Sequence, residues 1–73
     1  MRYHPVVSTV LALIGYDQDT RKLEVVFRSG SIYLYIDVPS RLWKELLAAD
    51  SKGKYYNQFI KDKFEFIKKE RAA

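Results

Sequence analysis

Two neighbouring stretches in the first half of the chain alternate between apolar and polar positions. They are KLEVVFR (residues 22–28) and SIYLYID (residues 31–37), and Ser29 and Gly30 stand between them. A period of two in runs rich in β-branched and aromatic residues is typical of strands, and a short break containing glycine is typical of a hairpin turn. The pattern therefore predicts an antiparallel hairpin.

The register of this hairpin depends on the turn. If Ser29 and Gly30 are its two loop residues, Val25 lies opposite Leu34 on the core side of the sheet. A third strand is predicted in the segment TVLALIGY (residues 9–16), where Ile14 would pair with Val25. The side chains left on the other, outer face would form a partly exposed patch for a protein partner or a second copy of the chain, made of Leu11, Leu13, Val26, Tyr33 and Tyr35.

The period changes to a helical one after Val38-Pro39. A first helix is predicted from Ser40, a suitable N-cap, because apolar residues recur with helical spacing at Leu42, Trp43, Leu46 and Leu47. A second helix is expected from about Lys52 to about Lys69, with Ser51 as its N-cap. Its apolar arc is interrupted by Lys63, which either extends its ammonium to the edge of the arc or marks a bend near Asp62.

These elements predict an α+β fold, in which a three-stranded antiparallel β-meander is followed by two α-helices packed on one sheet face. The length of 73 residues allows a single domain over residues 1–73. The expected core consists of Val25, Phe27, Leu34, Trp43, Leu46, Phe59 and Ile60.

The ordered set of motifs resembles a known family. IGYD at residues 14–17 is followed by G-x-x-Y-x-Y-x-x-V-P from Gly30 to Pro39, and then by a helical segment that includes Ser51 and Gly53. The sequence from about Ser8 to about Phe64 is similar to the KTSC domain, which is named after the C-terminal region of some lysyl-tRNA synthetases. The resemblance implies no established enzymatic activity and a link to RNA or translation by domain association.

Charge is unevenly distributed along the chain. Residues 1–39 hold four basic and four acidic residues, whereas residues 40–73 hold nine basic and five acidic, so the net charge of +4 arises in the second half. This pattern fits an anionic partner there, or a lysine-rich solvated surface.

The longest apolar run, residues 6–15, is too short to span a membrane, so a cytoplasmic protein without a membrane partner is expected.

The sequence offers little chemistry of its own. There is no cysteine, His4 is the single histidine, and no glycine-rich phosphate loop is present, so we expect no enzyme, no metal and no cofactor. A site for RNA or another nucleic acid is placed at the start of the second helix, where free amides, lysines and an aromatic ring coincide. Its residues are Lys52, Gly53, Lys54, Tyr55 and Lys61. The alternative is that the segment has a structural role only, as the bend between two helices and the cap of the second.

Overall fold

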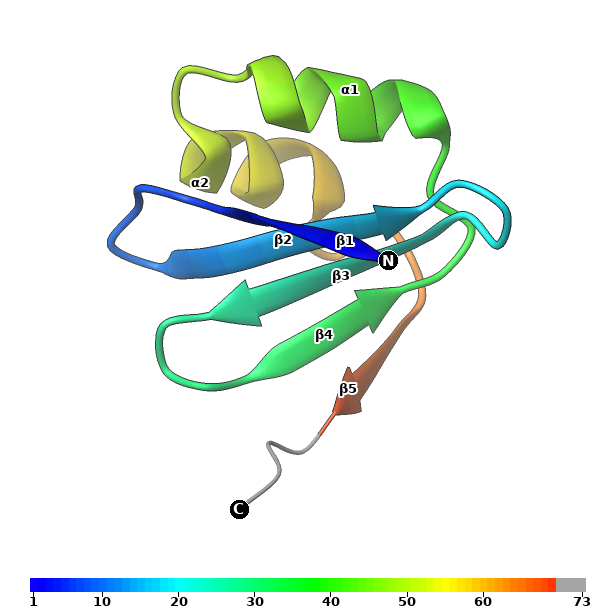
Figure 1. The fold of residues 1–73 in the computed structure, drawn as a ribbon, viewed down its shortest axis with the longest axis horizontal. Coiled ribbons are helices and arrows are strands. Elements are labelled where there is room, and N and C mark those ends of the chain that lie inside the picture. The colour runs from blue at the N-terminus through cyan, green and yellow to red at the C-terminus, as the bar shows by residue number, and fades with distance from the viewer. Residues whose placement is uncertain (70–73) are drawn as a thin grey trace.

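Five antiparallel strands form one sheet in the computed structural model, which describes residues 1–69. Each strand pairs with the next strand along the chain, so the sheet is a simple meander (Figure 1). The strands are β1 (Arg2–Pro5), β2 (Leu11–Asp17), β3 (Lys22–Phe27), β4 (Ile32–Tyr35) and β5 (Phe66–Lys69).

The helical segments lie between β4 and β5 in the sequence and cover one face of the sheet (Figure 1). They are α1 (Ser40–Ala48), α2 (Lys52–Tyr55) and a π-helical turn, η1 (Tyr56–Ile60), which continues α2. The N-cap of α1 is Pro39, so Ser40 begins the helix and does not cap it. The predicted α+β class is confirmed, but the sheet has five strands where three were predicted.

The additional strand at the N-terminus, β1, pairs with β2 and places His4 opposite Ile14. The sequence did not predict it, because four residues that end at Pro5 provide too little alternation to identify. A proline at this position is acceptable because β1 is an edge strand of the sheet.

The second helix ends much earlier than predicted. The backbone is helical to Ile60, Lys61 is extended, and Asp62 adopts a left-handed conformation with φ of 62°. Aspartate tolerates this region better than most residues. The chain then turns back, so Lys63 lies beyond the helix and residues 66–69 form β5 beside β4.

The turn between β3 and β4 contains three residues, one more than predicted. The Phe27 amide donates to the Ser31 carbonyl at 2.9 Å, and Gly30 closes the turn with φ of 99°. The Gly30 amide donates to the Phe27 carbonyl at 2.9 Å, so a tight turn that ends at a positive-φ glycine forms a three-residue hairpin loop. Val25 therefore lies opposite Tyr33, and the predicted pairing with Leu34 is wrong by one residue.

A one-residue change in register moves every β4 side chain to the opposite face of the sheet. Tyr33 and Tyr35 consequently face the helices, whereas Leu34 faces the outer, helix-free side. A β-bulge at Ala12 has a similar effect in β2 and turns Leu11 into the core, where it is fully buried.

The predicted outer patch is therefore incorrect as a single surface. Of its members only Leu13 and Val26, which pair with each other, remain on the outer face. The pairing of Ile14 with Val25, which fixes the rest of the β2–β3 register, is confirmed.

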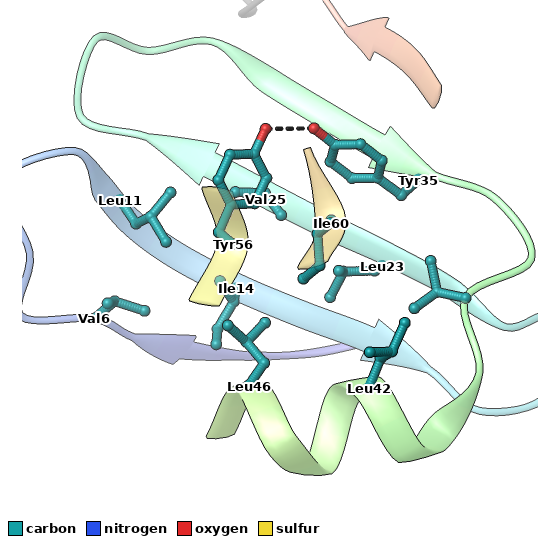
Figure 2. Close-up of a cluster of buried hydrophobic side chains, with 11 residues drawn as sticks. Val6, Leu11, Ile14, Leu23, Val25, Tyr35, Leu42, Leu46, Tyr56 and Ile60 are labelled. Carbon is teal, nitrogen blue, oxygen red and sulfur yellow. Dashed lines mark hydrogen bonds between the residues drawn. The ribbon is translucent and has the colours of Figure 1, made fainter. Parts of the chain in front are cut away.

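The core lies between the sheet and the helices (Figure 2). Of the predicted core residues, Val25, Leu46 and Ile60 are fully buried, whereas Phe59 is 43% exposed and was assigned wrongly. The complete buried set is Val6, Leu11, Ile14, Leu23, Val25, Tyr35, Val38, Leu42, Leu46, Tyr56 and Ile60. Phe27 and Trp43 are partly buried and pack against this core.

Among residues 1–69, no helix has the length and the apolar character that crossing a membrane requires.

Candidate functional site

A cavity of about 390 Å³ lies between the β3–β4 hairpin, β5 and η1. We call it the aromatic pocket, because five of its lining residues are Phe27, Tyr33, Tyr35, Tyr56 and Phe66. The rest of the lining consists of the apolar Val10 and of five polar residues, namely Ser29, Ser31, Asn57, Lys61 and Asp62.

The aromatic rings support one another. Tyr33 and Phe66 stack with ring centroids 4.9 Å apart and planes 10° from parallel, while Phe27 meets Tyr33 and Tyr56 edge-on. Such pairs stabilise a fixed ring arrangement beyond the area they bury. Phe66 is 45% exposed, so part of its ring remains open to solvent.

The hydroxyls of Tyr35 and Tyr56 hydrogen-bond to each other at the inner side of this pocket (Figure 2). Burial raises the pKa of both phenols, and the negative charge of Asp62 raises each pKa further. Both side chains are therefore neutral at physiological pH and act as hydrogen-bonding groups, without the charge of a phenolate.

The wide turn of η1 positions the polar lining. The Lys61 amide donates to the Tyr56 carbonyl at 2.8 Å, which closes the turn five residues apart. Tyr56 and Ile60 face the core, whereas Asn57 and Lys61 are exposed and line the pocket. Single π-helical turns of this kind occur frequently at functional sites.

A second cavity, of about 270 Å³, adjoins the aromatic pocket, with which it shares Val10, Tyr56 and Asn57. Its other lining residues include Ser51, Gly53 and Lys54 at the start of α2, together with Ser8 and Thr9 from the loop before β2. Ser51 is the N-cap of α2, and its hydroxyl accepts a hydrogen bond from the Lys54 amide at 3.3 Å.

The five residues predicted to contact nucleic acid are only partly brought together. Gly53 and Lys54 line the second cavity and Lys61 lines the aromatic pocket. Lys52 and Tyr55 line neither, because the Lys52 ammonium donates to the Ala49 carbonyl and the Tyr55 hydroxyl donates to Glu45. Burial and the bond to Glu45 raise the pKa of Tyr55 to about 12.

Several residues of the pocket were missed at the sequence level. Asn57 was placed within a plain helix, Phe66 was placed on a helix and lies on β5, and Asp62 was considered only as a bend. The sequence contained one signal for this region, which was the interruption of the apolar arc at Lys63.

The outer face of the sheet holds a separate polar cluster. The Glu24 carboxylate is almost fully buried and accepts hydrogen bonds from the Tyr3 hydroxyl at 2.6 Å and from the Lys69 ammonium at 2.8 Å. Burial would raise the Glu24 pKa, but these two bonds outweigh it and lower the pKa. Apolar side chains on the same face are Leu13, Val26, Ile32, Leu34 and Ile67.

The arrangement of charged side chains bears on metal binding. Within residues 1–69, no three His, Cys, Asp or Glu side chains come together in a group that could hold a metal ion.

Comparison with known proteins identifies relatives of two kinds. A segment of lysine–tRNA ligase from Nostoc punctiforme is 43% identical over 59 residues, which is 81% of this chain but 10% of that protein. This chain thus spans about a tenth of that ligase. A protein from Tsukamurella paurometabola is 36% identical over 63 residues, and the match covers 86% of this chain and 94% of that protein.

A solved structure supports the same assignment. The KTSC domain protein of Yersinia pestis is 40% identical and superposes with a TM-score of 0.88 over 93% of this chain and 96% of that one. The model of the KTSC domain family matches residues 7–64. The resemblance identified from the motifs is confirmed, and this chain belongs to the KTSC domain family.

Proposed function

We propose that this domain is a non-catalytic module that binds single-stranded RNA, with one base in the aromatic pocket and the neighbouring phosphates on lysines of the α2–η1 segment. The observation that carries the proposal is the position of Lys61, which lines the aromatic pocket, next to the adjoining cavity lined by Lys54.

The shape and lining of the pocket suit a base. A volume of about 390 Å³ lies within the range of small-ligand sites, and the exposed part of Phe66 offers a face for stacking. Stacking of a base on an aromatic side chain contributes about 1–3 kcal/mol in single-strand binding proteins.

The surrounding charge suits a phosphate backbone. Lys54 and Lys61 are exposed, and the Lys68 ammonium lies 5.9 Å from the centre of the Tyr33 ring, which lines the pocket. Positive side chains beside stacking rings are the usual combination for binding single strands. Because these lysines are few, we expect a weak complex whose affinity decreases with salt.

The relatives favour RNA over DNA as the partner. Lysine–tRNA ligases of Nostoc punctiforme and Trichormus variabilis contain a segment similar to this chain. By their name, these ligases act on a transfer RNA. RNA is therefore the nucleic acid with which we test the proposal.

The test is a fluorescence anisotropy titration with a labelled 12-residue RNA of mixed sequence. Wild type is compared with Lys54→Ala/Lys61→Ala and with the control Arg41→Ala/Lys44→Ala, whose two exposed cations lie on α1. The site variant should bind more weakly, with a salt slope smaller by about 1.4, since each single-strand phosphate contact contributes about 0.7. Equal binding by the two variants would contradict the proposal.

A second candidate is a protein-interaction module, either a homodimer or an accessory subunit, that uses the outer face of the sheet. No helix of the described residues covers this face (Figure 1), and Ile67 on it is 53% exposed. Val26→Lys should weaken self-association in a sedimentation experiment, because it places a charge on this face. A monomer at all concentrations would remove the homodimer.

A further inference from the structure

We propose that the aromatic pocket selects guanine among the four RNA bases, and that the Asp62 carboxylate makes the selection by accepting the two N–H groups of the guanine Watson–Crick edge. This inference rests on the proposed function, in which the aromatic pocket holds one base of a single strand.

The position of Asp62 supports this role. The residue follows Lys61, the C-cap of η1, and lines the aromatic pocket, in which its negative charge acts on the Tyr35 and Tyr56 hydroxyls. Within residues 1–69, no cation lies close enough to form an ion pair with it. Its left-handed backbone, with φ of 62°, fixes the direction in which the chain leaves the helix.

Base chemistry then distinguishes guanine. An ionised carboxylate only accepts hydrogen bonds, and its two oxygens match a pair of parallel donors. Guanine presents such a pair, because N1–H and the N2 amino group are adjacent. Adenine and cytosine present one amino group next to an acceptor nitrogen, which a carboxylate repels. Uracil presents a single N3–H between two carbonyls.

Another lining residue complements the rest of the base. Asn57 carries an amide N–H donor at the same cavity, and guanine presents further acceptors that include O6 and N7. The Phe66 ring provides a stacking face of the kind that RNA readers use for unpaired bases. A single pocket therefore combines an acceptor pair, donors and an aromatic wall.

The test uses four RNA pentamers that differ only in the central base, namely UUGUU, UUAUU, UUCUU and UUUUU, titrated against the whole chain by fluorescence anisotropy. Wild type should bind UUGUU about tenfold more tightly than the other three, which corresponds to about 1.4 kcal/mol. This comparison needs no variant, so it does not depend on the folding of a mutant.

The variant is Asp62→Asn, because asparagine tolerates the left-handed backbone and keeps the side-chain shape. It replaces one acceptor oxygen by a donor, so the preference for UUGUU should disappear. Removal of a negative charge should leave binding of the other pentamers unchanged or tighter.

The matched control is Asp37→Asn. Asp37 is also exposed and left-handed, with φ of 63°, but it lies outside the pocket lining. It removes the same charge and should keep the tenfold preference.

The outcomes separate the two proposals. Equal binding of all four pentamers by wild type would overturn guanine selection and leave RNA binding in place. A preference that persists in Asp62→Asn would also overturn it. If neither the pentamers nor the longer RNA bound, the proposed function would fail and guanine selection with it.

Discussion

The hydrogen-bonded carboxylate of Glu24 should stabilise the fold in its ionised form. It connects three strands, because Tyr3 lies on β1, Glu24 on β3 and Lys69 on β5. Glu24→Gln keeps the shape and one acceptor oxygen but removes the charge. Since hydrogen bonds to charged groups contribute about 1.5–3 kcal/mol and neutral ones about 0.5–1.5, the substitution should lower the free energy of unfolding by about 1–2 kcal/mol.

This loss should depend on pH. The Glu24 pKa is lower in the folded protein than in the unfolded chain, so the ionised carboxylate stabilises the fold fully above the unfolded pKa. That contribution disappears as the pH falls through the folded pKa. The difference between wild type and Glu24→Gln should therefore be complete at pH 7 and shrink below about pH 4.

Thermal melting followed by circular dichroism measures the effect, with about 4–8 °C expected per kcal/mol for a domain of this size. The control is Glu65→Gln, since the Glu65 side chain is exposed and makes no hydrogen bond or ion pair within residues 1–69. It should melt like wild type at pH 7. The reasoning about Glu24 would be refuted if Glu24→Gln melted like wild type at pH 7, or if its deficit were the same at pH 7 and pH 3.

Three further substitutions test the helical segment that borders the pocket. Ile60→Ala should cost about 2–5 kcal/mol in a urea melt, because Ile60 is fully buried, whereas Phe59→Ala should cost much less, because Phe59 is 43% exposed. Equal losses of stability in the two variants would mean that Phe59 is buried as well as Ile60, and the orientation of η1 would then be wrong. Ser51→Ala should cost about 0.5–2 kcal/mol through loss of the cap on α2, and an unchanged melting temperature would show that the cap is not needed.

The parts of the fold that the sequence predicts well are those with a long, regular period. The pairing of β2 with β3 follows from two alternating runs, and α1 follows from a helical period after Pro39. In both cases several residues specify the same face, so the bulge at Ala12 shifts the partner of Leu11 and leaves the predicted pairing of residues 13–17 intact.

The parts that the sequence did not predict depend on one or two residues. Ser29-Gly30 is compatible with a two-residue or a three-residue loop, and the periodicity of β4 fits either face, since Tyr33 and Leu34 are both acceptable in a core. The short edge strands β1 and β5 are similarly ambiguous, because four residues are too few to define a period.

The candidate site also contains some residues that the sequence predicts and others that it does not. Lys54 could be identified because it lies near the predicted start of the second helix, and Lys61 because it is a basic residue within that predicted helix. Asp62 and Asn57 could not, since their position depends on where the helix stops. That end is set by a left-handed residue and a π turn, which leave no periodic signal.

The existence of the aromatic pocket follows from the length of the β3–β4 turn. With a two-residue turn, Tyr33 and Tyr35 would lie on the outer face, and aliphatic side chains such as Leu34 would face the helices. The additional turn residue reverses this arrangement and brings both tyrosines opposite Tyr56 and Phe66. The length of this turn therefore decides whether aliphatic side chains or tyrosines face the helices. With three residues in the turn, the edge of the core becomes a cavity lined by hydroxyls and aromatic rings. The same residue removes these rings from the outer face, so the two candidate surfaces differ in chemistry: aromatic and basic on the helical side, aliphatic around Glu24 on the other.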